Sequence, residues 1–438
     1  MRKHLCLLVA VATLPLALSA PLQAQTLEPK PASSYFEKFR PLKAPPIPGL
    51  ILHEGDSVAV CGDSITEQKM YSRIIETYLT IAVPELKITV RQHGWSGETA
   101  PGFLARMTND VLRFHPGVAT TCYGMNDHGY RPYNKSIGER YQTASTAIVE
   151  AFKAAGARVI LGSPGCVGKL PAWSKFPDAG VEGLNLNLCE LRNLDIKTAA
   201  KEEVGFADVF WPMLVAGEKA RENLKPDYAL AGKDGVHPGW AGHLVMAWAF
   251  LRSLGLDGNI GTFTVDLAAG QASTSTGHEV VSYQDGSLRL KSSRYPFCAA
   301  GRDVTDDNEI RSGMALVPFN QELNRLTLVV KNGTASHYRV TWGSQVRIYP
   351  ADVLARGVNL AADFDANPFS AAFAKVDAAV AAKQAYETRQ IKELFHGPEG
   401  RRDIEATVAL TEEVRTPLAK AIQEAFTPVT HTIKIEAQ

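Results

Sequence analysis

Short apolar runs alternate with longer amphipathic stretches through the first half of the chain. Where the amphipathic stretches place apolar residues three or four apart, they predict helices, and the apolar runs between them predict buried β-strands. Strands that alternate with helices form a parallel sheet covered on both faces, with functional loops at the carboxyl ends of the strands. We therefore predict an α/β domain over residues 50–256. The predicted strands are 57–61, 87–90, 118–123, 158–161 and 206–210, and the predicted helices are 67–83, 101–114, 137–155, 186–203 and 238–254.

The pattern changes in residues 257–438, which we predict to be an accessory β-rich region with a long C-terminal helix. Serine, threonine and glycine become frequent here, and apolar residues often stand at every second position. Asn332-Gly333 lies between the apolar segments 326–330 and 338–348, and this dipeptide is typical of a tight hairpin turn. A last alternating segment, 427–436, predicts a closing strand.

The long helix is predicted over residues 368–395. Its apolar side chains recur at steps of four, three and four, and Gly397-Pro398 follows as a stop signal. Such a stripe needs a neighbour to cover it, so we expect this region to wall one side of the cleft rather than to form a separate binding module. The stripe consists of Phe369, Phe373, Val376 and Val380.

The N-terminus has the pattern of a targeting segment. Arg2 and Lys3 precede an apolar run at 5–18, and Leu22-Gln23-Ala24 follows. Residues 1–24 are therefore predicted to be a signal peptide. The mature chain is expected to be exported, either to the periplasm or out of the cell. The run is too short for a transmembrane helix, so no stable membrane anchor is expected. Residues 25–49 carry many prolines and predict an extended lead-in.

Composition excludes several classes of function. Lysine plus arginine and aspartate plus glutamate number 46 each, so the basic excess that nucleic-acid binding needs is missing. The six cysteines form no Cys-x-x-Cys pair and no cluster at zinc spacing, so neither a metal nor another cofactor is implied. Export permits disulfides, and Cys166 with Cys189 is a candidate bridge.

Two segments carry residues suited to nucleophilic catalysis. Ser64 follows the first predicted strand and precedes a helix, which places its hydroxyl beside backbone N–H groups. A serine hydroxyl needs an imidazole to take its proton and a carboxylate to orient that imidazole. Asp234 and His237 stand three apart just before the last predicted helix and are the candidates for those two roles. Taken alone, Ser64 could equally be a helix-capping serine.

Four short motifs follow one another in an order that resembles the SGNH (GDSL) hydrolase superfamily, over about residues 55–256. The resemblance implies a flavodoxin-like three-layer α/β/α core and ester hydrolysis through an acyl-enzyme. It matches Ser64 to the nucleophile, His237 to the base and Asp234 to the orienting acid. The motifs are Gly62-Asp63-Ser64, Gly94-Trp95-Ser96-Gly97, Gly124-Met125-Asn126-Asp127 and Asp234-Gly235-Val236-His237.

The same resemblance matches Gly97 and Asn126, together with the Ser64 backbone, to the donors of an oxyanion hole. Amide donors aimed at the developing oxyanion are what acyl transfer requires. Either Gly94 or Gly97 could be the glycine of its motif. Trp95 and Asp127 are further candidates for contact with substrate, because each lies inside a motif.

The ester itself is less well defined by the sequence. Aromatic residues near the predicted loops suit stacking on sugar rings. Exported members of this superfamily with an added β-rich region resemble carbohydrate esterases. The leading hypothesis is therefore that the substrate is a small-molecule or glycan ester, most simply an acetyl ester. A lysophospholipase, a thioesterase or a general acyl esterase is the alternative, and a glycan-binding or glycan-transferring scaffold is the third. The oligomeric state is open. The aromatic residues are Trp95, Tyr130, Tyr133, Trp173 and Trp240.

Overall fold

Five parallel strands form the sheet that carries the site, in the order β2-β1-β3-β4-β5. The computed structural model describes residues 26–47, 49–299 and 301–438, so the predicted signal peptide lies outside the described residues. The strand order is that of a flavodoxin-like doubly wound sheet, in which loops at the carboxyl ends of the strands surround the site. The strands are β1 (Ser57–Gly62), β2 (Thr89–Gly94), β3 (Val118–Cys122), β4 (Arg158–Gly162) and β5 (Gly205–Ala207).

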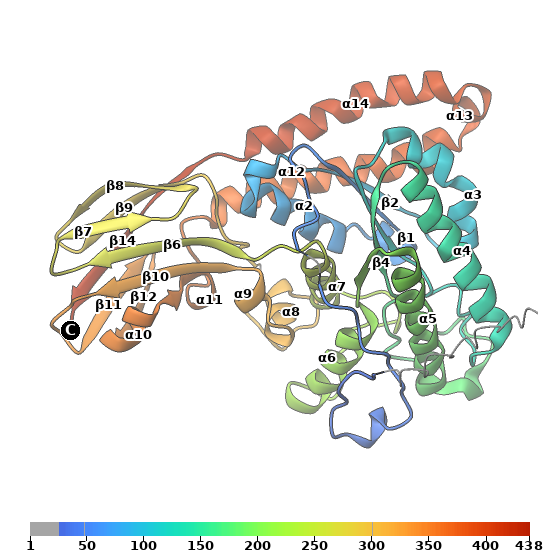
Figure 1. Cartoon of the computed structure of the whole chain (residues 1–438), viewed down its shortest axis with the longest axis horizontal. Coiled ribbons are helices and arrows are strands. Elements are labelled where there is room, and N and C mark those ends of the chain that lie inside the picture. The colour runs from blue at the N-terminus through green and yellow to red at the C-terminus, as the bar shows by residue number, and fades with distance from the viewer. Residues whose placement is uncertain (1–25, 48, 300) are drawn as a thin grey trace, which may run out of the picture.

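Helices cover both faces of this sheet, which confirms the predicted α/β/α layering (Figure 1). The apolar side chains of β1 point alternately to the two faces: Val58 and Val60 join the core formed with α2 and α7, whereas Ala59 and Cys61 join the core under α3, α4 and part of α5. The helices are α2 (Tyr71–Ala82), α3 (Ala100–Asp110), α4 (Lys135–Ala154), α5 (Gly180–Glu202) and α7 (Trp240–Ser253).

Two predicted elements of the core differ in the structure. The helix predicted over 67–83 begins only at Tyr71, as α2, because Lys69 has a left-handed backbone with φ of 57°; a separate short helix, α1 (Ser64–Glu67), precedes it. The strand predicted over 206–210 ends early, and its last apolar residues begin α6 (Phe210–Asn223), a helix that the sequence analysis missed. One continuous apolar run thus serves a strand and the helix after it.

The proline-rich lead-in is not extended throughout. A short 3-10 helix, η1 (Ser34–Phe36), interrupts it, and Phe36 and Phe39 are fully buried. Both rings pack against Trp211 of α6, at centroid distances of 5.5 and 6.2 Å. The lead-in therefore contributes to the core.

The expected bridge between Cys166 and Cys189 is wrong. Both residues are free thiols, and so are Cys61, Cys122 and Cys298. All five are buried among apolar neighbours, where a thiol behaves as a small hydrophobic side chain.

Two sheets make the β-rich part of the C-terminal region, in the orders β13-β10-β6-β7 and β12-β11-β14-β9-β8. The predicted hairpin at Asn332-Gly333 is wrong, because β10 and β11 on either side of this turn belong to different sheets. β11 pairs instead with β12 after the turn at Gly343, inside the segment predicted as one strand. The strands are β6 (Asn259–Asp266), β7 (Gln271–Thr274), β8 (His278–Gln284), β9 (Ser287–Ser292), β10 (Arg325–Lys331), β11 (His337–Trp342), β12 (Gln345–Pro350), β13 (Val358–Asn359) and β14 (Val429–Ala437).

From the sandwich of these two sheets, one long helix leads to the α/β core and a second leads back to β14, both at the top of Figure 1. The predicted long helix is α12 (Ser370–Arg389), continued by a π-helical segment, η5 (Gln390–Phe395). It packs on α2 and β2, and α14 (Ile404–Ala425), which the sequence analysis missed, packs on α12. Shorter helices are α8 (Ile310–Leu316), α9 (Phe319–Glu322), α10 (Ala351–Arg356), α11 (Leu360–Asp363), α13 (Pro398–Arg402), η2 (Pro84–Leu86), η3 (Leu112–Phe114) and η4 (Pro177–Ala179).

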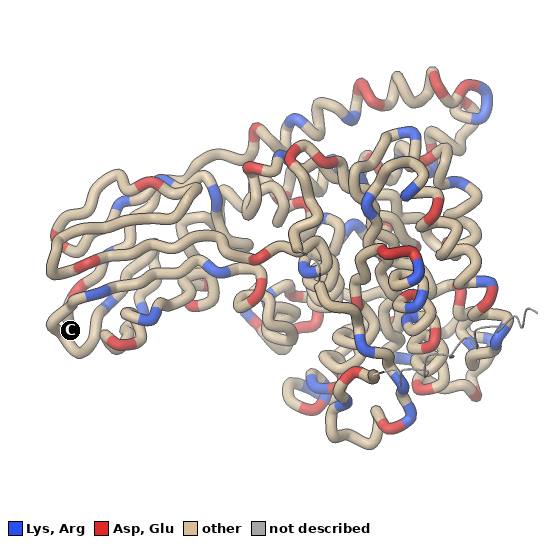
Figure 2. Tube along the Cα trace, in the orientation of Figure 1, with Lys and Arg blue, Asp and Glu red and all other residues tan. Residues whose placement is uncertain are grey.

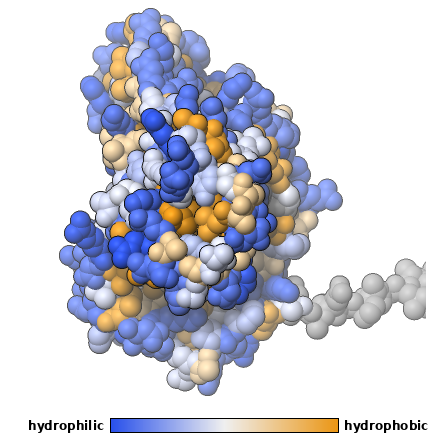
Figure 3. Space-filling view, turned by 90° about the vertical axis from the view of Figure 1, so that its left-hand side faces the viewer, coloured by the Kyte–Doolittle hydropathy of each residue, from blue (hydrophilic) through white to orange (hydrophobic). Residues whose placement is uncertain are grey.

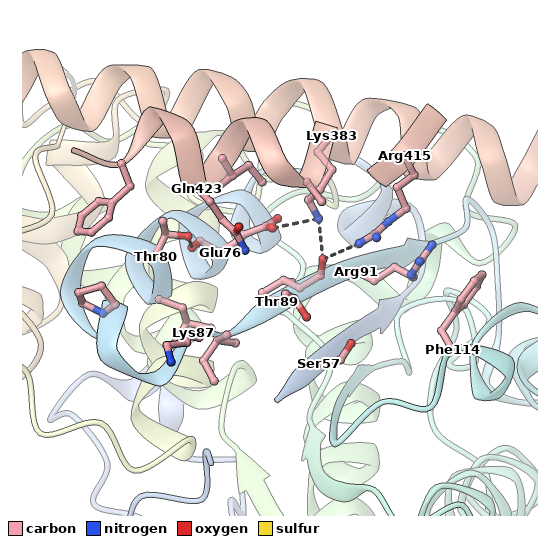
Figure 4. Close-up of a pocket in the computed structure, with 17 residues that line it drawn as sticks. Ser57, Glu76, Thr80, Lys87, Thr89, Arg91, Phe114, Lys383, Arg415 and Gln423 are labelled. Atoms are coloured by element: carbon pink, nitrogen blue, oxygen red, sulfur yellow. Dashed lines mark hydrogen bonds and ion pairs between the residues drawn. The ribbon is translucent and has the colours of Figure 1, made fainter. Parts of the chain in front are cut away.

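Side chains of α12 cover the free edge of β2, an edge strand of the parallel sheet, and Figure 4 shows one of them, that of Lys383. Lys383 Nζ donates to the Val90 carbonyl at 2.6 Å, and a Glu387 carboxylate oxygen accepts from the Gln92 amide at 3.1 Å. Side chains of a helix thus form hydrogen bonds with backbone groups that would otherwise pair with a sixth strand. A cavity of about 410 Å³ remains beside these contacts, between β2, α2 and α14.

Along the trace of the described residues, basic and acidic positions are interspersed over both parts of the molecule (Figure 2). The end of the molecule formed by the sandwich is mainly hydrophilic, with smaller apolar areas between the polar side chains (Figure 3). Within the described residues, no helix combines the length and the apolar character that crossing a membrane requires.

Candidate active site

Ser64 is the first residue of α1, directly after β1 ends. The Asp63 side chain caps this helix by accepting from the Ile65 amide at 2.9 Å. Asp63 is buried, and burial raises the pKa of its carboxyl to about 7. Ser64 itself is partly exposed, so the turn places its hydroxyl at the surface of the site, while the buried neighbouring residues fix the turn.

The structure brings Ser64, His237 and Asp234 together. His237 Nε2 lies 2.8 Å from Ser64 Oγ, and His237 Nδ1 lies 2.7 Å from Asp234 Oδ2. With Nδ1–H donated to the carboxylate, Nε2 carries the lone pair that can accept the serine proton. This is the arrangement that activates a serine hydroxyl as a nucleophile.

Local backbone contacts keep Asp234 ionised and fixed. Its Oδ1 accepts from the amides of Val236 and His237, both at 2.9 Å. Partial burial raises the pKa of Asp234, but these amides and the His237 ring outweigh burial, so the pKa lies below its usual value. Gly235 permits this tight turn, since its φ is +88° and a Cβ there would lie 2.1 Å from the Lys169 carbonyl oxygen.

The loop after β2 separates the two candidate glycines. Gly94 ends the strand, and a Cβ there would lie 2.2 Å from the Glu67 amide, so this position serves close packing. Gly97 lies in an exposed turn closed by a hydrogen bond from the Glu98 amide to the Trp95 carbonyl, and its φ is +75°. A glycine is favoured at the third position of such a turn. Within the described part of the chain, the Gly97 amide has no acceptor, which leaves it available to a ligand.

Asn126 follows β3 and reaches the same loop. Its Nδ2 donates to the Glu98 carbonyl at 3.0 Å, and its Oδ1 accepts from the Tyr130 hydroxyl at 3.3 Å. These two contacts fix which way the amide points. One Nδ2 proton remains without an acceptor among the described residues and can serve as a second donor.

Asp127 does not lie where a substrate contact was expected. Its side chain is only 3% exposed, and its carboxylate accepts from the amides of Ala100 and Gly124, each at 3.0 Å. Burial raises the pKa of Asp127 to about 6, despite these hydrogen bonds. The residue pins the loop that carries Asn126 to the start of α3.

Trp95 lies at the rim of the site, where the C-terminal region meets the α/β core. Its ring packs edge-on against His396 at 4.9 Å, and Lys392 Nζ lies 5.5 Å from the ring centroid. Arg106 lies 5.0 Å from the same centroid and forms an ion pair with Glu98. Two side chains from the C-terminal region, those of Lys392 and His396, therefore contact the ring of Trp95.

Aromatic side chains also lie beside His237. The Trp173 ring lies 6.0 Å from the His237 ring and 5.7 Å from the Tyr130 ring. Trp173 is 44% exposed, so a flat apolar surface is open to solvent beside the imidazole. Two other aromatic candidates have different surroundings: Tyr133 lies just before α4, and the Arg73 guanidinium lies 5.6 Å from the Trp240 ring.

The sequence analysis missed three polar residues near the site. Glu67 lies one turn after Ser64, which was the only local signal for it. Lys392 and His396 lie more than 300 positions further along the chain, and no motif marks them.

Comparisons with known proteins show what the α/β core is similar to. Residues 60–245 match the model of the GDSL-like lipase/acylhydrolase family. An acetylxylan esterase from Geobacillus stearothermophilus is 26% identical over 220 residues, which are 47% of this chain and 94% of that protein. Its crystal structure aligns with 47% of this chain and 96% of its own at 25% identity, with a TM-score of 0.38.

A second solved structure covers the C-terminal region as well. A gut microbial diltiazem-metabolizing enzyme superimposes on 89% of this chain and 100% of its own with a TM-score of 0.70, at 21% identity. The α/β core and the sandwich-and-helix region therefore occur together in another protein of the same fold.

The parallel sheet, with a serine at its first strand-to-helix turn, and the family match over that sheet define a serine ester hydrolase. Residues 60–245 therefore form a domain of the GDSL (SGNH) hydrolase superfamily, and the matched segment includes Ser64, Asn126, Asp234 and His237.

Proposed function

We propose that the protein hydrolyses short acyl esters, with acetyl esters of carbohydrates as its substrates, and that Ser64, His237 and Asp234 carry the reaction. The observation behind this proposal is the unbroken hydrogen-bonded chain from Asp234 through His237 to Ser64, at 2.7 and 2.8 Å. A catalytic base has to lie within hydrogen-bond reach of the proton that it removes, and His237 Nε2 does so.

In the first half of the reaction, Ser64 Oγ attacks the ester carbonyl carbon while its proton moves to His237 Nε2. The carbonyl oxygen becomes an oxyanion, for which the Ser64 and Gly97 amides and Asn126 Nδ2 are the donors. When the intermediate collapses, the C–O bond to the alcohol breaks and His237 returns the proton to that alcohol. Asp234 stays ionised throughout and stabilises the imidazolium.

In the second half, water replaces the alcohol. His237 removes a proton from the water, which attacks the acyl carbon, and the same donors hold the second oxyanion. Collapse releases the carboxylic acid and restores the Ser64 hydroxyl. Two acyl transfers through one serine thus hydrolyse the ester.

The substrate class rests on the rim and on the similarity to an acetylxylan esterase. Trp95 and Trp173 offer aromatic surfaces at the site, which suit stacking on sugar rings. Lys392 and His396 make the Trp95 side polar, and this suits a hydroxylated substrate better than a long acyl chain.

The first test compares turnover of p-nitrophenyl acetate and p-nitrophenyl octanoate by the wild type and by Ser64→Ala, with release of acetate from acetylated xylan measured beside them. We expect a preference for acetate, release from the polymer, and a loss of several orders of magnitude in Ser64→Ala. Preference for octanoate without polymer activity would favour a lysophospholipase, thioesterase or general acyl esterase. Turnover that does not depend on Ser64 would contradict the mechanism.

We also propose that the chain is exported and begins at Gln25 after cleavage. The support is the basic start and short apolar run of residues 1–24. Expression in a bacterial host followed by mass spectrometry of the periplasmic fraction should find a chain that lacks residues 1–24. A full-length chain confined to the cytoplasm would contradict export.

A further inference from the structure

The loop that holds Gly97 is attached to the C-terminal region by a relay of two side chains. Glu67, on the same short helix as Ser64, accepts a hydrogen bond from the Ser96 amide. Lys392 of η5 donates to both carboxylate oxygens of Glu67, at 2.8 and 2.9 Å. The relay therefore joins three parts of the chain: the helix of Ser64, the turn of Gly97 and a segment 325 positions away.

This relay is partly shielded from water. The side chain of Glu67 is 19% exposed and that of Lys392 is 28% exposed. Burial raises the pKa of Glu67, but the Lys392 ammonium and the Ser96 amide outweigh burial, and the pKa lies below its usual value. Glu67 is thus an anion that accepts from both sides, and the loss of Lys392 would remove the cation that pairs with it directly.

The position of Lys392 is set by contacts that precede it in the chain. Along α12, Lys383 and Glu387 bind backbone groups of β2, as described above. The next turn is the π-helical segment η5, in which Gln390 donates to Thr411 and Glu412 of α14. Single π-helical turns often occur at functional sites, and here the turn brings Lys392 to the carboxyl end of β2.

The turn from Trp95 to Glu98 has few other restraints on its exposed side. Ser96 and Gly97 are both exposed, and Gly97 has open space where a Cβ would be. The turn is closed at its base by bonds from Trp95 N to the Gly62 carbonyl and from Glu98 N to the Trp95 carbonyl. The Ser96 amide is the point at which the exposed tip is held, one peptide away from the Gly97 amide.

We propose that Glu67 and Lys392 are positioning residues that hold the Gly97 amide in place for the oxyanion, so that the C-terminal region completes the active site. The inference rests on the proposed function, because it takes Gly97 as an oxyanion donor. An oxyanion donor helps only when it is fixed before the reaction begins, and displacement of a reacting group by about 1 Å can cost about 10²-fold in rate. Neither residue needs to touch the substrate.

The test measures kcat and KM for p-nitrophenyl acetate in Lys392→Met, Lys392→Arg and Glu67→Gln, with the melting temperature of each variant. We expect Lys392→Met to lower kcat about 10- to 100-fold, with KM changed less than about 2-fold, because the donor acts on the transition state. Lys392→Arg should recover most of the rate, since it restores a cation beside Glu67. Lys375→Met, at an exposed position of α12, is the matched control and should behave like the wild type.

A double-mutant cycle separates positioning from general destabilisation. If Lys392 acts through Glu67, then Lys392→Met should cost less than about 2-fold when Glu67→Gln is already present. Three outcomes would each overturn the inference. In the first, the losses in kcat of the two single variants multiply in the double variant. In the second, kcat of Lys392→Met equals that of the wild type, and in the third its loss in kcat is explained entirely by a loss of folded protein. Glu67→Gln, which keeps the shape of the side chain, carries the test if Lys392→Met does not fold.

Failure of this inference and failure of the proposed function give different results. If Ser64→Ala keeps its activity, the proposed function is wrong and Gly97 has no oxyanion to hold. If Ser64→Ala is inactive while Lys392→Met and Glu67→Gln are both fully active, the catalytic serine stands and only the positioning role is wrong.

Discussion

Trp342 donates its indole N–H to Nδ1 of His431 across 3.1 Å in the core of the C-terminal sandwich. Because Nδ1 accepts this bond, the proton of a neutral His431 sits on Nε2, which lies 3.0 Å from Ser292 Oγ. The Ser292 hydroxyl then donates to His278 Nδ1 at 2.8 Å, and His278 Nε2 donates to the Ile260 carbonyl at 3.0 Å. Every donor has its acceptor only while both histidines are neutral.

We expect this chain of hydrogen bonds to make the fold sensitive to acid. Burial, and after it the neighbouring His278, lower the pKa of His431 to about 3, whereas an unfolded histidine titrates near 6.5. The stability that neutral His431 contributes is therefore complete above about pH 6.5 and is lost as the pH falls toward about 3. Between pH 7 and pH 5, the loss from this one residue should be about 2 kcal/mol.

Urea unfolding of the wild type and of His431→Gln at both pH values checks this expectation. His431→Gln should be the less stable protein at pH 7, and the difference in the free energy of unfolding should shrink by about 2 kcal/mol at pH 5. A difference that is the same at both pH values would show that His431 does not titrate in this way.

Asp234→Asn should leave the fold intact and remove most of the activity. The amide of asparagine can donate to the ring of His237, which favours the tautomer whose Nε2 carries a proton and cannot accept one from Ser64. We expect kcat for p-nitrophenyl acetate to fall by about 10³-fold or more. Asp178→Asn, at an exposed carboxylate of η4, is the control and should keep full activity. Near-normal turnover by Asp234→Asn would remove the carboxylate from the mechanism.

Lys383→Met should destabilise the protein strongly. Lys383 is only 1% exposed, and its ammonium bonds the Val90 carbonyl and pairs with Glu387 and Glu76 at 2.8 and 3.0 Å. Its removal leaves buried carboxylates with less compensation, and breaking a buried pair in this way costs about 3–5 kcal/mol. Urea unfolding of Lys383→Met beside Lys375→Met measures the difference. A loss below about 1 kcal/mol would mean that water or rearrangement replaces the ammonium.

Trp173→Ala should affect carbohydrate binding more than chemistry. The side chain is 44% exposed, so stability should hardly change, but an aromatic surface beside His237 is lost. We expect KM for acetylated xylo-oligosaccharides to rise about 3- to 10-fold while kcat for p-nitrophenyl acetate stays within about 2-fold. Phe176→Ala, at a similarly exposed aromatic residue nearby in the chain, is the control. An equal effect of Trp173→Ala on both substrates would argue against a sugar-binding surface.

The core of the site could be predicted from sequence because local pattern marks the places of its residues and the order of the four motifs, through the family resemblance, assigns their roles. Ser64 lies where an apolar strand meets a helix. Asp234 and His237 lie just before the last predicted helix of the α/β domain. The order of a flavodoxin-like sheet brings such positions to one edge, so no side-chain contact had to be known in advance.

Elements without a local signal were missed. α14 buries only Thr407, Thr411 and Ile422 and contains Pro417, so it has no apolar stripe to reveal it. The turn at Asn332-Gly333 was recognised from its residues, but turn chemistry does not determine which sheet the next strand joins. Lys392 reaches Glu67 from 325 positions away, and such a contact exists only once the chain has folded.

The edge of β2 has a consequence for any shortened form of this protein. Without α12, the Val90 carbonyl and the Gln92 amide would face solvent on an unpaired strand that is otherwise buried. Such an edge is a template for another chain to add a strand, and addition from copy to copy leads to aggregates. A fragment that ends after α7 would keep every residue of the hydrogen-bonded chain from Asp234 to Ser64, yet it should leave solution by self-association.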